Sequence, residues 1–114
     1  AGLVVAMLPA VTKLTPVTLA QYLKVEATPP QDPDFSLMIQ RYRQLHHATN
    51  LGLIHSAHDV SEGGVLTAAA EMALGEIGIS LVIPSHEVTE LFGEGPGMIV
   101  FTATKTNMAQ IEQL

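Results

Sequence analysis

The sequence predicts one domain of the α/β or α+β class, with a mixed sheet and helices. Strand-like apolar runs alternate with segments whose apolar residues recur at helical spacing, and there is no internal repeat or low-complexity tract. The 114 residues suffice for one domain or part of one. Aliphatic side chains must build its core, because 47% of the residues are hydrophobic but only 4% are aromatic.

The first part of the chain is predicted to hold a strand, an undecided segment and a helix. Residues 2–8 are apolar and are expected to form a buried strand. Residues 17–25 fit a short helix or a strand, and the prolines of residues 28–33 exclude regular structure there. A helix follows, with Asp32 or Asp34 near its start and an end at Asn50 and Gly52.

The remainder continues this alternation. Residues 53–57 are a strand candidate, and Ser61 is the expected N-cap of a helix over residues 62–74 that ends at Gly75. The elements expected after it are a strand over residues 77–83, a short helix over 85–92, a glycine-rich loop over 93–97, a strand over 98–103 and a helix from Thr106.

Composition excludes several classes of function. A net charge of −6, with only five Lys plus Arg, argues against a nucleic-acid surface and against binding to an anionic membrane. The absence of cysteine excludes disulfides, thiolate zinc sites and cysteine nucleophiles, and it fits a reducing cytosol. The apolar run at residues 2–9 is too short to span a bilayer, and no basic segment of a signal peptide precedes it. We therefore expect a cytoplasmic protein without nucleic-acid or membrane partners.

One run of eleven residues is far denser in chemistry than the rest of the chain, with two imidazoles, two carboxylates, two hydroxyls and a glycine pair: His55-Ser56-Ala57-His58-Asp59-Val60-Ser61-Glu62-Gly63-Gly64-Val65. It lies where an apolar segment meets a helix, so backbone N–H groups, the helix dipole and acidic side chains come together. Such a junction can hold a phosphate together with its metal ion.

On the residues alone, a structural explanation of the same run is as well supported as a binding site. Gly63 and Gly64 in a first helical turn cost about 1 kcal/mol each relative to alanine, so another backbone or a ligand is expected to approach them closely. In the structural explanation, Asp59 and Ser61 cap the helix and the glycines serve tight packing.

The other polar groups carry weaker signals. His55 and His58 lack a third ligand for zinc. One of them could hydrogen-bond a phosphate or a neighbouring carboxylate, although a histidine of this kind is more often a satisfied, partly buried side chain. His46-His47 is expected on a solvated helix face. The loop over residues 93–97 lacks the Lys and Ser/Thr of a P-loop. Glu62 and Glu71 lie on different helix faces and form no acid–base pair, and no hydrolase triad or nucleophile elbow is present.

Three separated stretches follow one another in an informative order: Ser56-Ala57-His58-Asp59-Val60-Ser61-Glu62-Gly63-Gly64-Val65-Leu66, Ala69-Ala70-Glu71-Met72-Ala73 and Leu91-Phe92-Gly93-Glu94-Gly95-Pro96-Gly97. Together they strongly resemble the phosphoribosylformylglycinamidine synthase family, over roughly residues 20–114. The resemblance implies a C-terminal α/β domain of the type shared with aminoimidazole ribonucleotide synthetase. It also implies the ATP- and glutamine-dependent amidination of formylglycinamide ribonucleotide in purine synthesis.

The resemblance also implies site residues and cofactors. Asp59 would be a ligand of magnesium in a Mg²⁺–ATP or Mg²⁺–ADP site, and no residue is given a catalytic role. The residues that would line the neighbouring phosphate region are Ser61, Gly63, Gly64, Glu94, Gly95 and Gly97.

The surroundings of the domain follow from the same resemblance. Residues 1–19 are expected to be a hinge or N-terminal segment, and residues 20–114 an incomplete domain that lacks the family's Gly-Gly-Ser segment and a strand before Ala20. The expected partners are the rest of the synthetase chain, its glutaminase domain or subunit and small-molecule nucleotides, and a homodimer of the fragment stays open. The chain alone is expected to be inactive, because the domain that supplies most of the ATP site is not in it.

Two other interpretations stay open. The chain could be the C-terminal domain of another superfamily member, of the selenophosphate synthetase or hydrogenase-maturation type, although residues 58–64 favour the purine enzyme. It could also be a non-catalytic packing or dimerisation domain, which an exposed apolar sheet face and self-association would favour.

Overall fold

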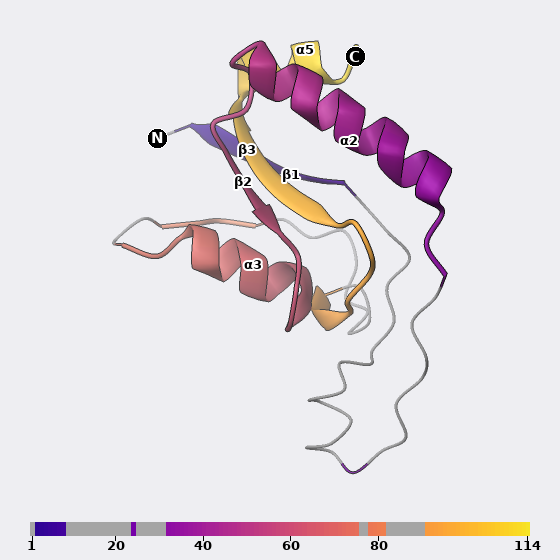
Figure 1. The fold of residues 1–114 in the computed structure, drawn as a ribbon. Coiled ribbons are helices and arrows are strands. Elements are labelled where there is room, and N and C mark those ends of the chain that lie inside the picture. Colours follow the sequence, from indigo (N-terminus) through magenta and orange to yellow (C-terminus); the bar gives the residue numbers. More distant parts are fainter. Residues whose placement is uncertain (1, 9–23, 25–31, 76–77, 82–90) are drawn as a thin grey trace.

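A three-stranded antiparallel sheet, with strand order β1-β3-β2, organises the computed structural model (Figure 1), which describes residues 2–8, 24, 32–75, 78–81 and 91–114. The elements are β1 (Leu3–Leu8), α2 (Phe35–Asn50), β2 (Ser56–Asp59), α3 (Gly64–Met72), β3 (Ile99–Thr104) and α5 (Lys105–Ile111). The predicted combination of a sheet with helices is confirmed. Among the described strands both pairings are antiparallel, so this part of the chain forms an α+β arrangement.

The central strand β3 pairs along its whole length with β1, from Leu3 opposite Thr104 to Leu8 opposite Ile99. On its other side β2 pairs from Ser56 opposite Thr102 to Asp59 opposite Ile99. The predicted strand over residues 2–8 is therefore present, but the prediction that it is buried is wrong, since its residues are half-buried or exposed. Among the described strands β1 has one neighbour, whereas β3 has two.

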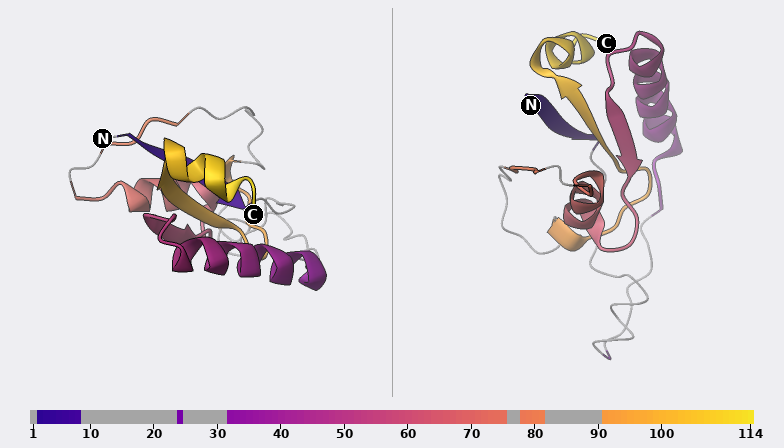
Figure 2. Two further views of the ribbon diagram at one scale, coloured as in Figure 1. Left: turned by 90° about the horizontal axis from the view of Figure 1, so that it is seen from above. Right: turned by 90° about the vertical axis from the view of Figure 1, so that its left-hand side faces the viewer.

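The core lies between the sheet and α3. Val100 and Met98 pack with Val60 and Ala68 in a cluster that Val5, Val65 and Met72 adjoin. In the right-hand view of Figure 2 the sheet is seen face-on, with α3 in front of it and α2 farther back on the β2 side. The packing of α3 on the sheet sets where the end of β2 and the start of α3 meet.

Local signals determine α2. The Asp34 side chain accepts a hydrogen bond from the Leu37 N–H, as an N-cap does, so the predicted helix start is confirmed. The helix ends at Asn50, and Gly52 follows with φ of +69°, a left-handed conformation that favours glycine. His46 and His47 are exposed as predicted.

Helix α2 is the longest described helix, and it includes a short polar contact near its end. The His46 Nε2 and Asn50 Nδ2 atoms lie 2.9 Å apart, one helical turn from each other. In the described part of the chain, no helix combines the length and the apolar character needed to cross a membrane.

Two strand predictions need correction. The strand predicted over residues 53–57 forms at Ser56–Asp59 instead, so His58 and Asp59 belong to β2. The shift follows from pairing with β3, since the His55 N–H donates to the Thr102 carbonyl just before the ladder begins. Residues 78–81 are not a strand, although their alternating sequence predicted one, which shows that period-two alternation alone does not supply a pairing partner.

The C-terminal predictions agree better with the structure. The predicted strand over residues 98–103 is β3, and the helix expected from Thr106 begins one residue earlier, with the Thr104 hydroxyl accepting from the Asn107 N–H. Leu91 and Phe92 are helical, as the end of the predicted helix over residues 85–92 requires.

Several predictions fall outside the described residues: the undecided segment over residues 17–25 apart from Lys24, most of the proline linker, the missing strand before Ala20, residues 77, 82 and 83, and residues 85–90. The domain boundary at residue 20 stays a prediction. Within the described part, Leu3–Leu8 belongs to the same sheet as β3.

Candidate functional site

The junction between β2 and α3 carries the candidate site, and its turn differs from the predicted one. Helix α3 begins at Gly64 rather than at Glu62, and Ser61 is not its N-cap. The backbone is left-handed at Gly63 and Gly64, with φ of +84° and +73°. A right-handed helix cannot continue back through these two residues, so α3 has Gly63 as its N-cap and Gly64 as its first residue, and it starts two residues later than the sequence predicted.

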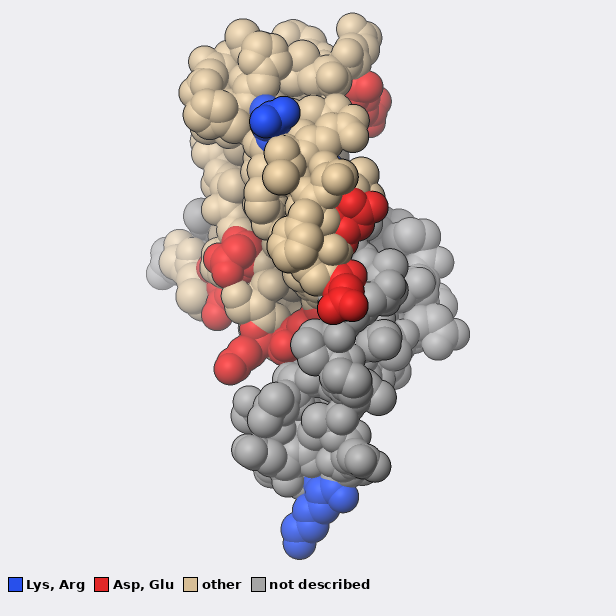
Figure 3. Space-filling view, turned by 45° about the vertical axis from the view of Figure 1, so that its right-hand side comes forward, with Lys and Arg blue, Asp and Glu red and all other residues tan. Residues whose placement is uncertain are grey.

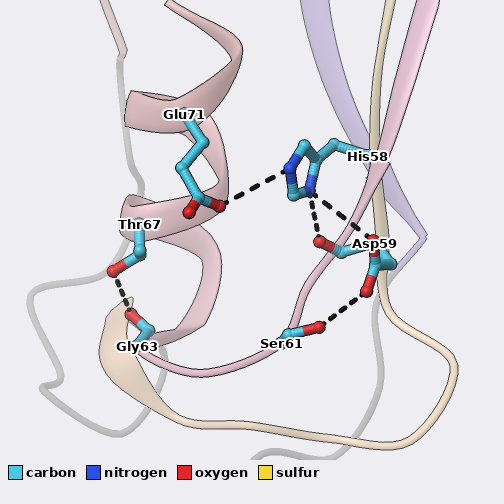
Figure 4. A network of polar contacts seen from close by, with 6 residues as sticks. All are labelled: His58, Asp59, Ser61, Gly63, Thr67 and Glu71. Atoms are coloured by element: carbon cyan, nitrogen blue, oxygen red, sulfur yellow. Dashed lines mark hydrogen bonds and ion pairs between the residues drawn. The ribbon is translucent and has the colours of Figure 1, made fainter. Parts of the chain in front are cut away.

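The Ser61 hydroxyl instead serves Asp59. Its Oγ donates to the Asp59 Oδ2 across 2.6 Å, a short bond typical of a hydroxyl and a carboxylate (Figure 4). This bond is the main reason that the pKa of Asp59 lies below its ordinary value, with smaller contributions from a backbone hydrogen bond of Asp59 and from the nearby His58 ring. The Asp59 side chain is 78% exposed, so it presents a carboxylate to solvent at the end of β2.

The His58 ring lies between two carboxylates. Its Nδ1 is 2.6 Å from the Asp59 carbonyl oxygen and 3.8 Å from the Asp59 Oδ1, while its Nε2 is 3.5 Å from the Glu71 Oε2 (Figure 4). The hydrogen bond of the His58 ring goes to a backbone carbonyl, while the two carboxylates lie at ion-pair distance, so His58 fits the predicted partly buried side chain. Sequence reasoning missed Glu71 as its partner, because only the packing of α3 beside β2 brings residues 58 and 71 together.

The glycine pair permits a close crossing of two chain segments. A Cβ atom on Gly64 would lie 2.6 Å from the Cα of Phe92 and 2.8 Å from its carbonyl oxygen, so only glycine fits there. At Gly63 an added Cβ would meet the Thr67 side chain, whose hydroxyl donates to the Gly63 carbonyl. The tight packing given by the structural explanation is therefore present, whereas the side chains of Asp59 and Ser61 bond to each other and do not cap α3.

Two contacts join residues 60–63 to residues 94–98. The Gly63 N–H donates to the Glu94 Oε1 at 3.0 Å, and the Val60 N–H donates to the Met98 carbonyl at 3.0 Å. The structure thus brings together two of the predicted motifs, although 31 residues separate Gly63 from Glu94. A carboxylate beside the first N–H groups of a helix is stabilised by the helix dipole.

The other predicted site residues lie around this junction. Gly97 has φ of +79°, and a Cβ on it would meet Met38 and Tyr42 of α2, so this glycine lies against that helix. Gly95 is half-buried in the same loop. The Gly64 N–H donates to the Ser61 carbonyl, so the N–H groups of both paired glycines have partners within the chain.

We expect replacement of Glu94 by alanine to reduce the free energy of unfolding by about 1–3 kcal/mol, because the half-buried Gly63 N–H loses its charged acceptor. Glu94→Gln should retain more than half of this stability, since its amide oxygen still accepts. Urea denaturation measures both, with Glu62→Ala as the control because Glu62 is an exposed acid of the same turn. Equal effects of the Glu62 and Glu94 changes would contradict the proposed bond.

Replacement of Ser61 by alanine should raise the pKa of Asp59 toward its ordinary value of 3.8. Because the pKa of Asp59 is lower in the folded protein than in the unfolded protein, its ionised form stabilises the fold at pH values above the unfolded-state pKa. This stabilisation is lost as the pH falls through the folded-state pKa. The Asp59 carboxyl-carbon shift, followed by NMR against pH, should therefore titrate at higher pH in the variant. Ser56→Ala, which removes an exposed hydroxyl of β2, should leave that titration unchanged.

Asp59 fits a magnesium ion only as one ligand among several. The described residues contain no group of three or more His, Asp or Glu that could hold a metal by themselves. Magnesium that accompanies a nucleotide needs no such cage, since one or two carboxylates, phosphate oxygens and water complete its octahedral shell. An exposed, readily ionised carboxylate with a fixed hydroxyl partner suits this role.

Comparisons with known proteins agree with the fold. Residues 13–112 match the family described as AIR synthase related protein, C-terminal domain. Over 86 residues, 75% of this chain, the sequence is 34% identical to phosphoribosylformylglycinamidine synthase subunit PurL of Lactobacillus helveticus, of which it covers 12%. Over 90 residues, 76% of this chain, it is 32% identical to the major tegument protein of Epstein–Barr virus in two strains, of which it covers 7%.

These comparisons cover most of the chain but a small part of each relative, since the chain spans 12% of PurL and 7% of the tegument protein. The family match includes α2, β2, α3 and β3, and with them the junction of residues 58–64 and the loop of residues 94–97. The chain therefore belongs to the family of AIR synthase related proteins, as a C-terminal domain of that family.

Proposed function

We propose that this domain supplies part of a Mg²⁺–nucleotide site in a phosphoribosylformylglycinamidine synthase. This enzyme amidinates formylglycinamide ribonucleotide with ATP and glutamine in purine biosynthesis. Family membership and the similarity to PurL support the assignment. The observation that carries the site is the exposed Asp59 carboxylate, fixed by Ser61 at the end of β2 and beside the start of α3.

Asp59 would coordinate magnesium in this proposal, and the metal would neutralise phosphate charge when bound. Ser61 orients the carboxylate and helps to keep it ionised. Acidic side chains spread over the middle of the described surface in Figure 3, where basic ones are sparse, so a free polyphosphate would be repelled. A nucleotide neutralised by magnesium suits such a surface better.

The phosphate region proposed beside Asp59 comprises Ser61, Gly63, Gly64, Glu94, Gly95 and Gly97. Support for a single region comes from the two hydrogen bonds that hold residues 60–63 against residues 94–98. Within it, Glu94 serves to hold the two segments together, because its carboxylate would repel a phosphate and already accepts from Gly63.

The remaining parts of the proposal concern the whole protein. The rest of the synthetase chain and a glutaminase domain or subunit would be its partners, and the cytoplasm its location. The 114-residue chain alone should bind nucleotide weakly or not at all and should have no activity. Micromolar ATP affinity of the chain by calorimetry would contradict this expectation.

Asp59→Asn tests the site. In the protein assembled with the rest of the synthetase, we expect calorimetry to show at least about 10-fold weaker binding of Mg²⁺–ADP, by analogy with changes around metal ligands. Binding of ADP without magnesium should not change. Glu112→Gln, which neutralises an exposed acid at the end of α5, is the matched control. Unchanged Mg²⁺–ADP affinity in Asp59→Asn would remove the site from this domain.

A second candidate function is a non-catalytic packing or dimerisation domain. Three large apolar residues on α2 are exposed at helical spacing: Phe35, Ile39 and Tyr42. In addition, one of the similar proteins, the major tegument protein, is not named as an enzyme. Sedimentation of the chain should then show a dimer that Phe35→Ser together with Ile39→Ser dissociates. A monomer at all concentrations would exclude self-association.

A further inference from the structure

A glutamate of α3 contacts a histidine of β2 at the candidate site. Glu71 lies near the C-terminal end of α3, two turns from Gly64, and its Oε2 is 3.5 Å from the His58 Nε2 (Figure 4). Both side chains are partly accessible to solvent. The contact links the helix directly to the strand residue that precedes Asp59.

The opposite edge of the His58 ring faces Asp59. Its Nδ1 is 2.6 Å from the Asp59 carbonyl oxygen and 3.8 Å from the Asp59 Oδ1. The imidazole therefore lies between the Glu71 carboxylate and both polar groups of Asp59. On its other oxygen, Asp59 accepts from Ser61 at 2.6 Å, so it has neighbours on two sides.

We propose that Glu71 is a positioning residue, which orients the His58 ring and through it the Asp59 carboxylate that would coordinate the magnesium of a bound nucleotide. This inference rests on the proposed function, because it concerns the same metal ligand. In this proposal Glu71 would touch neither metal nor nucleotide. It would act from outside the site, as the outer partners of metal-binding side chains do.

The need for positioning follows from the exposure of Asp59. A carboxylate that is 78% exposed at the end of a strand has rotational freedom, which it loses when it coordinates a metal. Fixed neighbours reduce that loss by holding the carboxylate in place before binding. Ser61 holds the Oδ2 atom, and the His58 ring, which Glu71 contacts, lies beside the Oδ1 atom.

The chain offers a conservative variant that tests this role. Glu71→Gln keeps the length of the side chain, and its amide can donate to or accept from the His58 Nε2. Glu71→Ala removes the contact and suits a helix. Glu112→Ala is the matched control, since it removes one exposed carboxylate and leaves the junction intact. Asp59→Asn reports separately on the proposed metal site.

We would measure Mg²⁺–ADP affinity by calorimetry for these variants, in the protein assembled with the rest of the synthetase. The expected result is about 10-fold weaker binding for Glu71→Ala, near-normal binding for Glu71→Gln and no change for Glu112→Ala. Affinity for ADP without magnesium should be equal in all of these variants. A variant that had lost its fold would also bind ADP alone more weakly, so this measurement separates misfolding from loss of the metal contact.

NMR relaxation of the His58 ring without nucleotide gives a readout that needs neither metal nor activity. An ordered ring, with an order parameter near the ~0.85 of rigid backbone, is expected in the unsubstituted protein and in Glu71→Gln, and a mobile ring in Glu71→Ala. A ring that already reorients freely in the unsubstituted protein would overturn the proposal, even if Glu71→Ala failed to fold.

The outcomes separate the two proposals. Normal Mg²⁺–ADP binding by Glu71→Ala, with weak binding by Asp59→Asn, would overturn the positioning role and leave the metal site standing. Normal binding by Asp59→Asn would overturn the metal site, and the positioning role with it. Equal losses in Glu71→Ala and Glu71→Gln would also overturn positioning, because the amide retains the pairing capacity.

Discussion

Gly64→Ala should lower the free energy of unfolding by about 2–5 kcal/mol. The new Cβ would lie 2.6 Å from the Phe92 Cα, and these backbone atoms belong to a separate chain segment that would have to move. A left-handed φ of +73° adds about 1–2 kcal/mol for a residue with a side chain. Urea denaturation measures the loss, and weaker protection of the Gly63 amide from hydrogen exchange should accompany it.

Gly52→Ala provides the matched control for this effect. Gly52 has nearly the same φ, +69°, but nothing lies within 4 Å of the position of its Cβ. It should therefore lose only the conformational part, about 1–2 kcal/mol. If the two substitutions had equal effects, the crossing of residues 63–64 with residue 92 would not be the reason for glycine at position 64.

The second large effect is expected for Phe101→Ala, at about 3–5 kcal/mol. Phe101 is 4% exposed in the central strand and lies opposite two small residues, Ala6 and Ala57. Strand alternation places it on the face away from Val100, so it is separate from the cluster that packs on α3. Because these two neighbours are small, their side chains cannot fill the cavity that loss of the Phe101 ring would leave.

Phe35→Ala is the control for this prediction, because Phe35 is 67% exposed at the start of α2. Its replacement should change the free energy of unfolding by less than about 0.5 kcal/mol, as surface substitutions usually do. Chemical denaturation monitored by circular dichroism gives both values. A loss below 1 kcal/mol for Phe101→Ala would mean that the sheet face opposite α3 contributes little to stability.

Local signals predicted α2 well and α3 less well. The Asp34 cap and the left-handed Gly52 act within a few residues of the helix that they delimit, so the sequence displays them. The start of α3 depends instead on Gly64, whose left-handed conformation accommodates the Phe92 backbone. A signal that originates 28 residues away cannot be found by a search for N-cap residues next to a helix.

The contacts at the candidate site were predictable only in part, although the residues of its central run could be singled out from the sequence. Asp59, Ser61 and the glycine pair were identified from that run, although the partner of the Ser61 hydroxyl was not. Glu71 was missed as a partner of His58, because its position beside β2 depends on packing between elements. The contact of Glu94 with Gly63 depends on tertiary structure in the same way.

The hydrogen bonds that join residues 60–63 to residues 94–98 also determine when the site can form during folding. Neither segment has its partner until β3 has paired with β2, and the Val60–Met98 bond extends that ladder at the Asp59 end. Contacts of such sequence separation form late relative to local helices. A nascent chain released before residue 94 would therefore contain Asp59, Ser61 and both glycines, but not in the arrangement of the candidate site. Formation of the candidate site thus requires that β3 has completed the sheet.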